Sequence, residues 1–357
     1  MSEFKASGFR DEFGSGGPDL VGITTMTSPY YFVPPSGSTA ERPSSPPPGM
    51  LRFNTDIGRL EVWRNDHWAT ILGEQSASIG TRGIFGSGYV APAATNTIQY
   101  VTIATTGNAL DFGDMTVARQ HHGDCASTTR GLFAGGQSPN TNVIDYITIA
   151  ATGNALDFGD ISTARGNANG ISDTTRGIFA GGSPGINTIE FVTMASTGNA
   201  ADFGDTTVVF ETSASFSSRT RGIVMAGYSN PANTNAINYL TIQSTGNAID
   251  FGDATAARRR LGGCSNSIRG VGAGGYVSSG VNIIDYITIS TTGNALNFGD
   301  LLSTTSVNIA AANSPIRAVF AGADSSNVIQ FITLPTTGDA QDFGDLLAAG
   351  NVNQGLS

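Results

Sequence analysis

Arginine and aspartate recur along this chain at a regular interval, and together they could supply acid–base or ion-pair chemistry. The arginines lie 45 to 48 residues apart, at Arg82, Arg130, Arg176, Arg221, Arg269 and Arg317. The aspartates each close a Phe-Gly-Asp triplet, at Asp114, Asp160, Asp205, Asp253, Asp300 and Asp345. A catalytic acid or base acts at one site, whereas these residues occur in all six units. The pattern therefore indicates a structural role, in strand-end hydrogen bonds or ion pairs within each unit.

Three consecutive arginines, Arg258, Arg259 and Arg260, are the one local exception to the repeat. Guanidinium groups bind carboxylates through paired hydrogen bonds, so this run could hold an anionic surface sugar or a carboxylate of a neighbouring subunit. The alternative interpretation is a solvated turn. We treat these three arginines as candidates for binding an anionic partner.

Other residue groups that suggest chemistry have simpler explanations. His121 and His122 lie near Asp124, but adjacent strand residues point to opposite faces, so one metal ion cannot readily bind both; lining of a central channel is their default role. Residues 270–275 spell Gly-x-Gly-x-x-Gly, yet the dinucleotide motif needs a following helix, and a polar loop follows here. No Ser/His/Asp, Cys/His or paired-carboxylate set stands apart from the repeat. The sequence therefore predicts no catalytic, cofactor-binding or metal-ligating residues.

Each repeat unit predicts four short strands. Residues 143–149 are rich in β-branched and aromatic residues, which favours a strand packed on both faces. A Thr-Gly-Asn turn follows, and about 15 residues then separate each Phe-Gly-Asp from the next recurring arginine, enough for one strand of small residues. Cys125 and Cys264 fall on these small-residue strands in opposite units, too far apart for a disulfide. A period of about 40–50 residues of this kind is typical of propellers and solenoids.

The repeat resembles the kelch family of propellers, and with it the galactose-oxidase type, over about 280 residues. A kelch unit runs from an Ala-Arg pair to a Gly-Gly doublet and then to a strand bearing tyrosine. The matching residues are Ala118-Arg119, Ala164-Arg165 and Ala257-Arg258; Gly135-Gly136, Gly181-Gly182 and Gly274-Gly275; and Tyr146 and Tyr286. The chain departs from the family at Phe112 and its five equivalents, where kelch units usually carry tryptophan.

The C-terminal residues predict how the repeats close. Residues 347–357 align with residues 163–172, so they predict an inner strand without the rest of its unit. The first unit lacks a clear inner strand, and the last strand can complete it and remove the free sheet edges. We therefore predict an all-β fold in which residues 76–357 form a six-bladed kelch-like β-propeller closed by the C-terminal strand. Its blades open at Arg82, Arg130, Arg176, Arg221, Arg269 and Arg317.

The first 75 residues are of a different composition. Residues 1–48 hold eight of the fourteen prolines and predict an extended anchoring arm, without a core of its own. An apolar patch in this arm, Tyr30, Tyr31, Phe32 and Val33, is the candidate for docking onto a particle. Residues 49–75 predict a small β-module with strands near residues 50–53, 59–63 and 67–72.

The β-module carries a second resemblance. Residues 49–63 read Gly-Met-Leu-Arg-Phe-Asn-Thr-Asp-Ile-Gly-Arg-Leu-Glu-Val-Trp, and residues 33–43 form a proline-rich lead-in. The string is similar to a module of tail-fibre and other virion appendage proteins of tailed bacteriophages, marine cyanophages especially. The resemblance covers about 40 residues and implies a virion component, whether of the tail, a fibre or the capsid.

Composition limits the classes of partner. The net charge is −10, only 13% of residues are charged and Lys5 is the single lysine, which argues against nucleic acid and against a basic membrane-binding surface. No apolar signal segment is present at the N-terminus, so release by lysis as part of a particle is the expected route out of a cell. Other virion proteins and further copies of this chain are the expected partners.

These features together predict a non-enzymatic virion structural protein, docked through its N-terminal arm and displaying a propeller head. The first alternative is a host-surface glycan or receptor-binding protein that uses the same head. The second is a carbohydrate-active or oxidase enzyme, which convergent acids or metal ligands would favour. The loops after the doublets are mostly Ser, Asn, Pro and Gly, with Tyr89, Tyr228 and Tyr276 as their aromatic residues, which favours the structural prediction.

Overall fold

The chain is built almost entirely from antiparallel β-sheets. A computed structural model describes residues 34–64, 66–70, 82–352 and 354–357. The chain divides into two compact units, Met1–Gly73 and Glu74–Ser357. Among the described residues the only helix is a 3₁₀ turn, Thr39–Glu41, and none has the length and apolar character to cross a membrane. The prediction of an all-β fold is confirmed.

The smaller unit is one four-stranded sheet in the order β1-β2-β3-β4. Its strands are β1 (Ser36–Gly37), β2 (Leu51–Asn54), β3 (Arg59–Arg64) and β4 (His67–Thr70). The last three match the strands predicted for the β-module. β1 lies within the segment predicted as an arm, and it pairs in parallel with β2. An ion pair between Arg42 and the buried Glu61 also ties this segment to the sheet, so residues 36–42 belong to the module.

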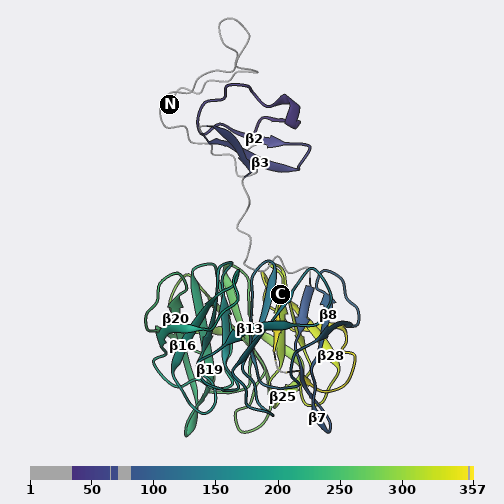
Figure 1. Ribbon diagram of the computed structural model, residues 1–357, viewed down its shortest axis with the longest axis vertical. Coiled ribbons are helices and arrows are strands. Elements are labelled where there is room, and N and C mark those ends of the chain that lie inside the picture. Colours follow the sequence, from purple (N-terminus) through teal and green to yellow (C-terminus); the bar gives the residue numbers. More distant parts are fainter. Residues whose placement is uncertain (1–33, 65, 71–81, 353) are drawn as a thin grey trace, which may run out of the picture. The chain divides into compact units, whose positions relative to one another are not determined.

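The larger unit contains six four-stranded antiparallel sheets, and five of them are meanders of consecutive strands (Figure 1). The first combines the C-terminal strand with three early ones: β31 (Gly355–Leu356), β5 (Arg82–Phe85), β8 (Thr97–Thr102) and β9 (Leu110–Asp114). The other five each use four consecutive strands: β10 (Gly123–Ala126), β11 (Arg130–Ala134), β12 (Val143–Thr148) and β13 (Leu156–Asp160); β14 (Asn169–Ser172), β15 (Arg176–Ala180), β16 (Thr188–Thr193) and β17 (Ala201–Asp205); β18 (Ala214–Ser217), β19 (Arg221–Ser229), β20 (Ala232–Thr241) and β21 (Ile249–Asp253); β22 (Gly262–Ser265), β23 (Arg269–Ala273), β24 (Val281–Thr288) and β25 (Leu296–Thr305); β26 (Ala310–Asn313), β27 (Arg317–Ala321), β28 (Val328–Thr333) and β29 (Gln341–Asp345).

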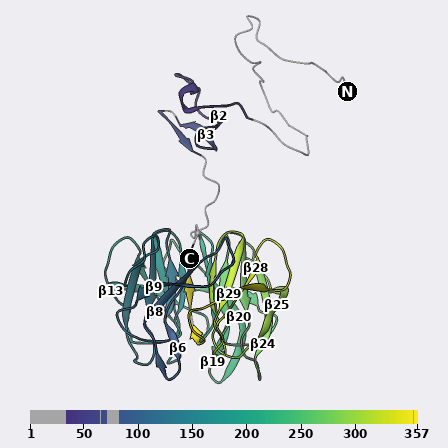
Figure 2. The ribbon, with the colours of Figure 1, turned by 90° about the vertical axis from the view of Figure 1, so that its right-hand side faces the viewer.

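The first strand of each sheet lies next to the first strand of its neighbours. β10 contacts β14, β14 contacts β18, β18 contacts β22, β22 contacts β26, and β31 contacts both β26 and β10. These strands consist mainly of small residues, as the sequence predicts. Gly355 and Leu356 of β31 pair with Phe85 and Ile84 of β5, so the C-terminal segment completes the sheet that contains Arg82. A short three-stranded sheet of β30 (Asn351–Val352), β6 (Gly88–Val90) and β7 (Ala93–Ala94) extends this seam (Figure 2).

The hydrophobic core is divided among the junctions between sheets. Six clusters of buried side chains each join two neighbouring sheets, and one of them joins β26–β29 to the sheet of β5. The phenylalanine of each Phe-Gly-Asp is buried and packs edge-on against an aromatic ring of its own sheet, with centroids 5.9–6.0 Å apart. Phenylalanine thus fills the position at which the kelch resemblance implies tryptophan.

The glycine of Phe-Gly-Asp is required by the approach of the next sheet. Gly159 has φ +145°, and a Cβ atom there would lie 2.5 Å from the carbonyl carbon and oxygen of Gly198. Gly198 belongs to the Thr-Gly-Asn turn of the following unit, and its N–H donates to the Phe158 carbonyl. Two repeat motifs that are far apart in sequence therefore form one contact between sheets.

Candidate functional site

The six recurring arginines join neighbouring sheets, whereas the sequence suggested bonds within one unit. Each donates from Nη1 to a backbone carbonyl of the following sheet at 2.8–3.0 Å, and Arg317 donates to Ile103 of the first sheet. Each guanidinium also lies over an aromatic ring of its own sheet, 4.3–4.9 Å from the ring centroid. A cation–π contact of this kind holds the side chain in place. These arginines are therefore structural.

The arginines of the Ala-Arg pairs are also structural, and Arg258 is one of them. Arg119, Arg165 and Arg258 are fully buried, and their guanidinium nitrogens lie 3.2, 2.7 and 2.8 Å from Asp145, Glu190 and Asp285. Arg258 also donates to the carbonyls of Gly272 and Gly274. Our assignment of Arg258 to an anionic partner is wrong, because its charge is already paired inside the sheet.

These buried ion pairs follow a rule of charge matching. In every sheet the residue equivalent to Asp145 accepts a hydrogen bond from the backbone N–H two residues after Phe-Gly-Asp. Where this residue is an acid, the fifth residue after the aspartate of Phe-Gly-Asp is arginine. Where it is Asn238, Gln330 or Gln99, that fifth residue is Phe210, Thr305 or Gly350. A buried charge without a partner is costly, which explains why the two positions change together.

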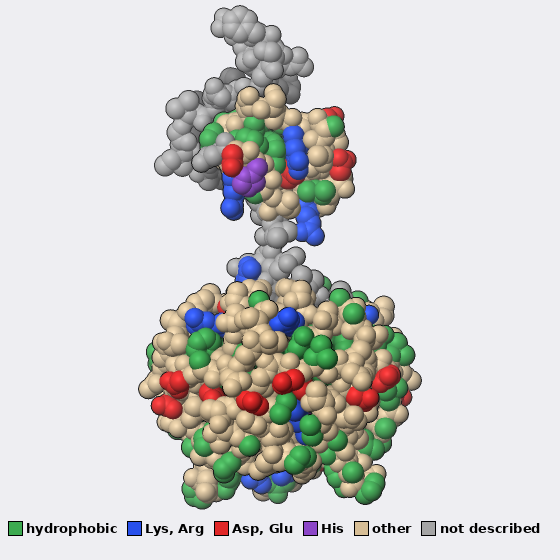
Figure 3. All heavy atoms as spheres, viewed as in Figure 1, with side chains coloured by type: hydrophobic (Ala, Val, Ile, Leu, Met, Phe, Trp, Pro, Cys, Tyr) green, Lys and Arg blue, Asp and Glu red, His purple; other side chains and the backbone are tan. Residues whose placement is uncertain are grey.

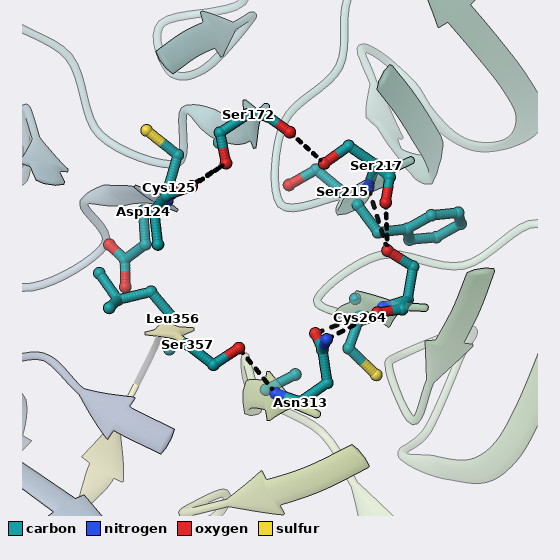
Figure 4. A pocket seen from close by; sticks show the side chains of 16 residues that line it. Asp124, Cys125, Ser172, Ser215, Ser217, Cys264, Asn313, Leu356 and Ser357 are labelled. Atoms are coloured by element: carbon teal, nitrogen blue, oxygen red, sulfur yellow. Dashed lines mark hydrogen bonds between the residues drawn. The ribbon is translucent and has the colours of Figure 1, made fainter. Parts of the chain in front are cut away.

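The axis of the larger unit is lined by the ends of the first strands (Figure 4). Ser217 Oγ donates to the Ser172 carbonyl at 2.6 Å, and Ser265 Oγ donates to the Ser217 carbonyl at 2.7 Å. Asn313 Nδ2 donates to the Ser265 carbonyl, and Asn313 N–H donates to Ser357 Oγ. Cys125 and Cys264 line the same small cavity as free, buried thiols, and burial raises the pKa of both. The hydrogen bonds along this part of the axis therefore join neighbouring sheets.

A larger cavity of about 440 Å³ lies beside the residues that precede the first strands. We call it the axial mouth and define it by residues 120–121, 167, 211–212, 259–260, 307–308 and 351, which all line it. Arg259 lies between two tyrosine rings, 5.1 Å from the centroid of Tyr228 and 5.3 Å from that of Tyr276. Arg260 also lies over Tyr276 and donates to the Ser306 carbonyl at 2.8 Å. Two of the three predicted arginines are therefore brought together with two of the loop tyrosines.

Four residues of the axial mouth have left-handed backbone conformations. They occupy equivalent positions in four consecutive sheets: His121 (φ 59°), Asn167 (φ 55°), Thr212 (φ 53°) and Arg260 (φ 68°). This conformation is uncommon outside glycine and is unfavourable for a β-branched residue such as threonine. Strained backbone of this kind is concentrated at ligand-binding and active sites. The axial mouth is therefore the candidate functional site.

The two histidines have different environments. His122 is buried, and its Nδ1 lies 2.5 Å from Asp124 Oδ1. His121 lines the axial mouth, 3.4 Å from Asn308 Nδ2. Burial, followed by the neighbouring His122 and Arg260, lowers the pKa of His121 from 6.5 to about 4. The described residues hold no group of three or more His, Cys, Asp or Glu side chains that could bind a metal ion.

Protonation of His121 is expected to destabilise the fold. Its pKa is lower in the folded chain than in the unfolded one, so its contribution to stability is complete above pH 6.5 and is lost as the pH falls towards 4. The expected loss is about 3 kcal/mol. Urea unfolding at pH 7.5 and pH 4 would measure it against His121→Asn, which copies Asn167 at the equivalent position. The stability difference between the two proteins should change with pH, and a constant difference would contradict the assignment.

Tyr30, Tyr31, Phe32 and Val33 lie outside the described residues. The glycines of the Gly-x-Gly-x-x-Gly string lie on β23 and in the turn after it, and a β-strand rather than a helix follows. Sequence reasoning missed Asn167, Glu211, Thr212 and Asn308 in the axial mouth. Asn167, Thr212 and Asn308 each lie two residues before the first strand of their sheet and Glu211 lies three residues before it, and the residues at these two positions differ from unit to unit.

No protein-family model matches this chain, and no curated protein matches it at a significant level.

Proposed function

We propose that residues 82–357 form a closed six-bladed β-propeller of the kelch type, completed by β31. Three sets of contacts between sheets support this proposal: the recurring arginines, the Phe-Gly-Asp glycines and the hydrophobic clusters. Each set links every sheet to the next, and each includes a link from the β26–β29 sheet to the first one. Completion by β31 covers the edge of β5 that would otherwise be free, and a propeller retains only short, protected sheet edges.

We further propose that the chain is a non-enzymatic virion structural protein of a tailed bacteriophage. The observation that carries this proposal is the use of the repeat's charged groups in structure: both recurring sets of arginines bind carbonyls or acids of the sheets. The resemblance of residues 49–63 to a virion appendage module supports it. The visible face of the larger unit, on which charged side chains are sparse and backbone and uncharged, non-hydrophobic side chains predominate, is suited to display outside a cell (Figure 3).

The N-terminal residues are expected to attach the protein to the particle. Because residues 36–42 belong to the sheet of the smaller unit, deletion of residues 1–33 removes Tyr30–Val33 without removing any described strand. A matched control lacks residues 1–28 and retains the four apolar residues. The test is co-sedimentation of each tagged protein with intact virus particles, together with a circular dichroism spectrum.

The full chain and the control are expected to sediment with particles, and the deletion of residues 1–33 should stay in solution with an unchanged β-rich spectrum. Incorporation of the shorter chain would assign attachment to other residues. Failure of the full chain to sediment with particles would refute the virion assignment.

Recognition of a host-surface glycan is the second candidate function. The axial mouth favours it, because its lining combines amides, hydroxyls and two arginines. A single site of this kind offers few aromatic platforms and modest affinity, so several copies on one particle would have to act together. No observation on the described residues favours the carbohydrate-active or oxidase enzyme.

A further inference from the structure

The two arginines of the axial mouth have no acidic partner among the described residues. Arg119, Arg165 and Arg258 each pair with an acid, whereas neither Arg259 nor Arg260 forms an ion pair with a described carboxylate. The pKa of Arg260 is lowered by burial and then by Arg259. This charge stands out in a chain whose net charge is −10.

The nearby acids are engaged elsewhere. Glu211 lines the axial mouth, but its Oε1 accepts a hydrogen bond from the Gly185 N–H at 2.8 Å. Asp324 accepts from both the N–H and the hydroxyl of Ser306. The residues that line the axial mouth supply two guanidinium groups and one carboxylate, that of Glu211. The balance of one positive charge matches a ligand with one negative charge, such as a carboxylate, better than a dianion.

The arginines are also preorganised to bind a ligand. Stacking fixes the Arg259 guanidinium between Tyr228 and Tyr276, and its Nε is buried without a hydrogen-bond partner among the described residues. An ordered guanidinium loses little entropy when it binds a planar carboxylate through two parallel hydrogen bonds. A buried donor without a partner costs free energy until a ligand accepts from it.

Two asparagines that line the same cavity have amide oxygens without a described hydrogen-bond donor. Asn167 and Asn308 are 8% and 4% exposed, and the Oδ1 atom of each has no partner among the described residues. Buried side-chain oxygens are nearly always paired. Carboxylates cannot donate to them, but the hydroxyl groups of a sugar can. The lining of the cavity therefore favours a single ligand that carries both a carboxylate and hydroxyl groups.

The size and position of the cavity fit such a ligand. A volume of about 440 Å³ is within the usual range of small-molecule sites. Partly exposed residues, Gln120 and Gln137, border the cavity and leave it accessible. We infer that the axial mouth binds the carboxylate of a sugar acid through Arg259 and Arg260, with Asn167 and Asn308 accepting from its hydroxyls. This site does not depend on the virion assignment.

The test uses the full chain in solution and isothermal titration at pH 7.5, with D-glucuronate as the probe. D-Glucose is the neutral control, acetate tests the carboxylate alone, and glucose 6-phosphate tests a dianion. We expect glucuronate to bind roughly tenfold more tightly than each of the other three. Equal binding of glucose would refute the role of the arginines. Equal binding of acetate would instead indicate an acidic side chain of a partner protein, and tighter binding of the phosphate would refute the carboxylate preference.

Matched variants test the residues. Arg259→Gln copies Gln120 and Arg260→Asn copies Asn167, so both variants use residues that the fold already holds at equivalent positions. Each should weaken glucuronate binding by roughly tenfold and leave the melting temperature nearly unchanged. The exposed Arg219→Gln is the control for a change of net charge and should bind as the unchanged chain does. Unaltered binding by the Arg259→Gln/Arg260→Asn double variant, or no glucuronate binding by the unchanged chain, would overturn the inference.

Discussion

Replacing Arg119 with phenylalanine is expected to lower the free energy of unfolding by about 3–5 kcal/mol. The change removes the partner of Asp145, which is fully buried and remains charged or must take up a proton. Asp145→Asn alone should be costly for the complementary reason, because the buried Arg119 guanidinium then lacks its acid. Urea unfolding of both single variants would measure these losses.

The double variant Arg119→Phe/Asp145→Asn should recover most of the lost stability. It reproduces the Phe210 and Asn238 combination of another sheet, in which the Asn238 side chain accepts from Thr207 as Asp145 accepts from Thr116. The coupling energy of the double-mutant cycle is therefore expected to be large. Additive losses would show that charge matching does not govern these positions.

Leu356→Ala is expected to lower the free energy of unfolding by about 2–5 kcal/mol. Leu356 is 4% exposed and belongs to the cluster that joins the first sheet to the second, with Ile84, Phe112 and Phe133. The truncation leaves a cavity where the C-terminal strand meets both sheets. Chemical denaturation of the full chain would measure the effect.

Leu347→Ala provides the control for this substitution. Leu347 is 53% exposed and precedes the C-terminal strands, so its truncation should change stability by less than about 0.5 kcal/mol. Equal effects of the two substitutions would mean that β31 does not hold the core, and the proposed closure of the ring would then fail.

The sequence predicted the strands of this fold more fully than the contacts between neighbouring sheets. The recurring triplets and glycines located the strands, and the alignment of residues 347–357 with residues 163–172 predicted the pairing with the first unit. The requirement for glycine in each Phe-Gly-Asp, as at Gly159, could not be predicted, because the atoms that exclude a side chain there belong to the next unit. The partners of the Arg82 type of arginine were missed for the same reason.

The candidate site could be predicted only in part. Arg259 and Arg260 interrupt the repeat and can be predicted as candidates, but Arg258 belongs to an Ala-Arg pair of the repeat and is structural. Asp285 indicates this structural role of Arg258, since an acid at this position accompanies each Ala-Arg pair. Asn167 and Asn308 are 141 residues apart, and no local pattern indicates that they share a cavity.

The seam of the larger unit has a consequence for its lifetime. β31 pairs with β5 through two residues, whereas β10 pairs with β11 through four. In a closed ring no terminal unit can unfold separately. Unfolding therefore begins where the strand pairing is shortest, at the pairing of β31 with β5. Durability is then a rate of opening, and that rate is controlled by a few residues rather than by the average strength of the six sheets.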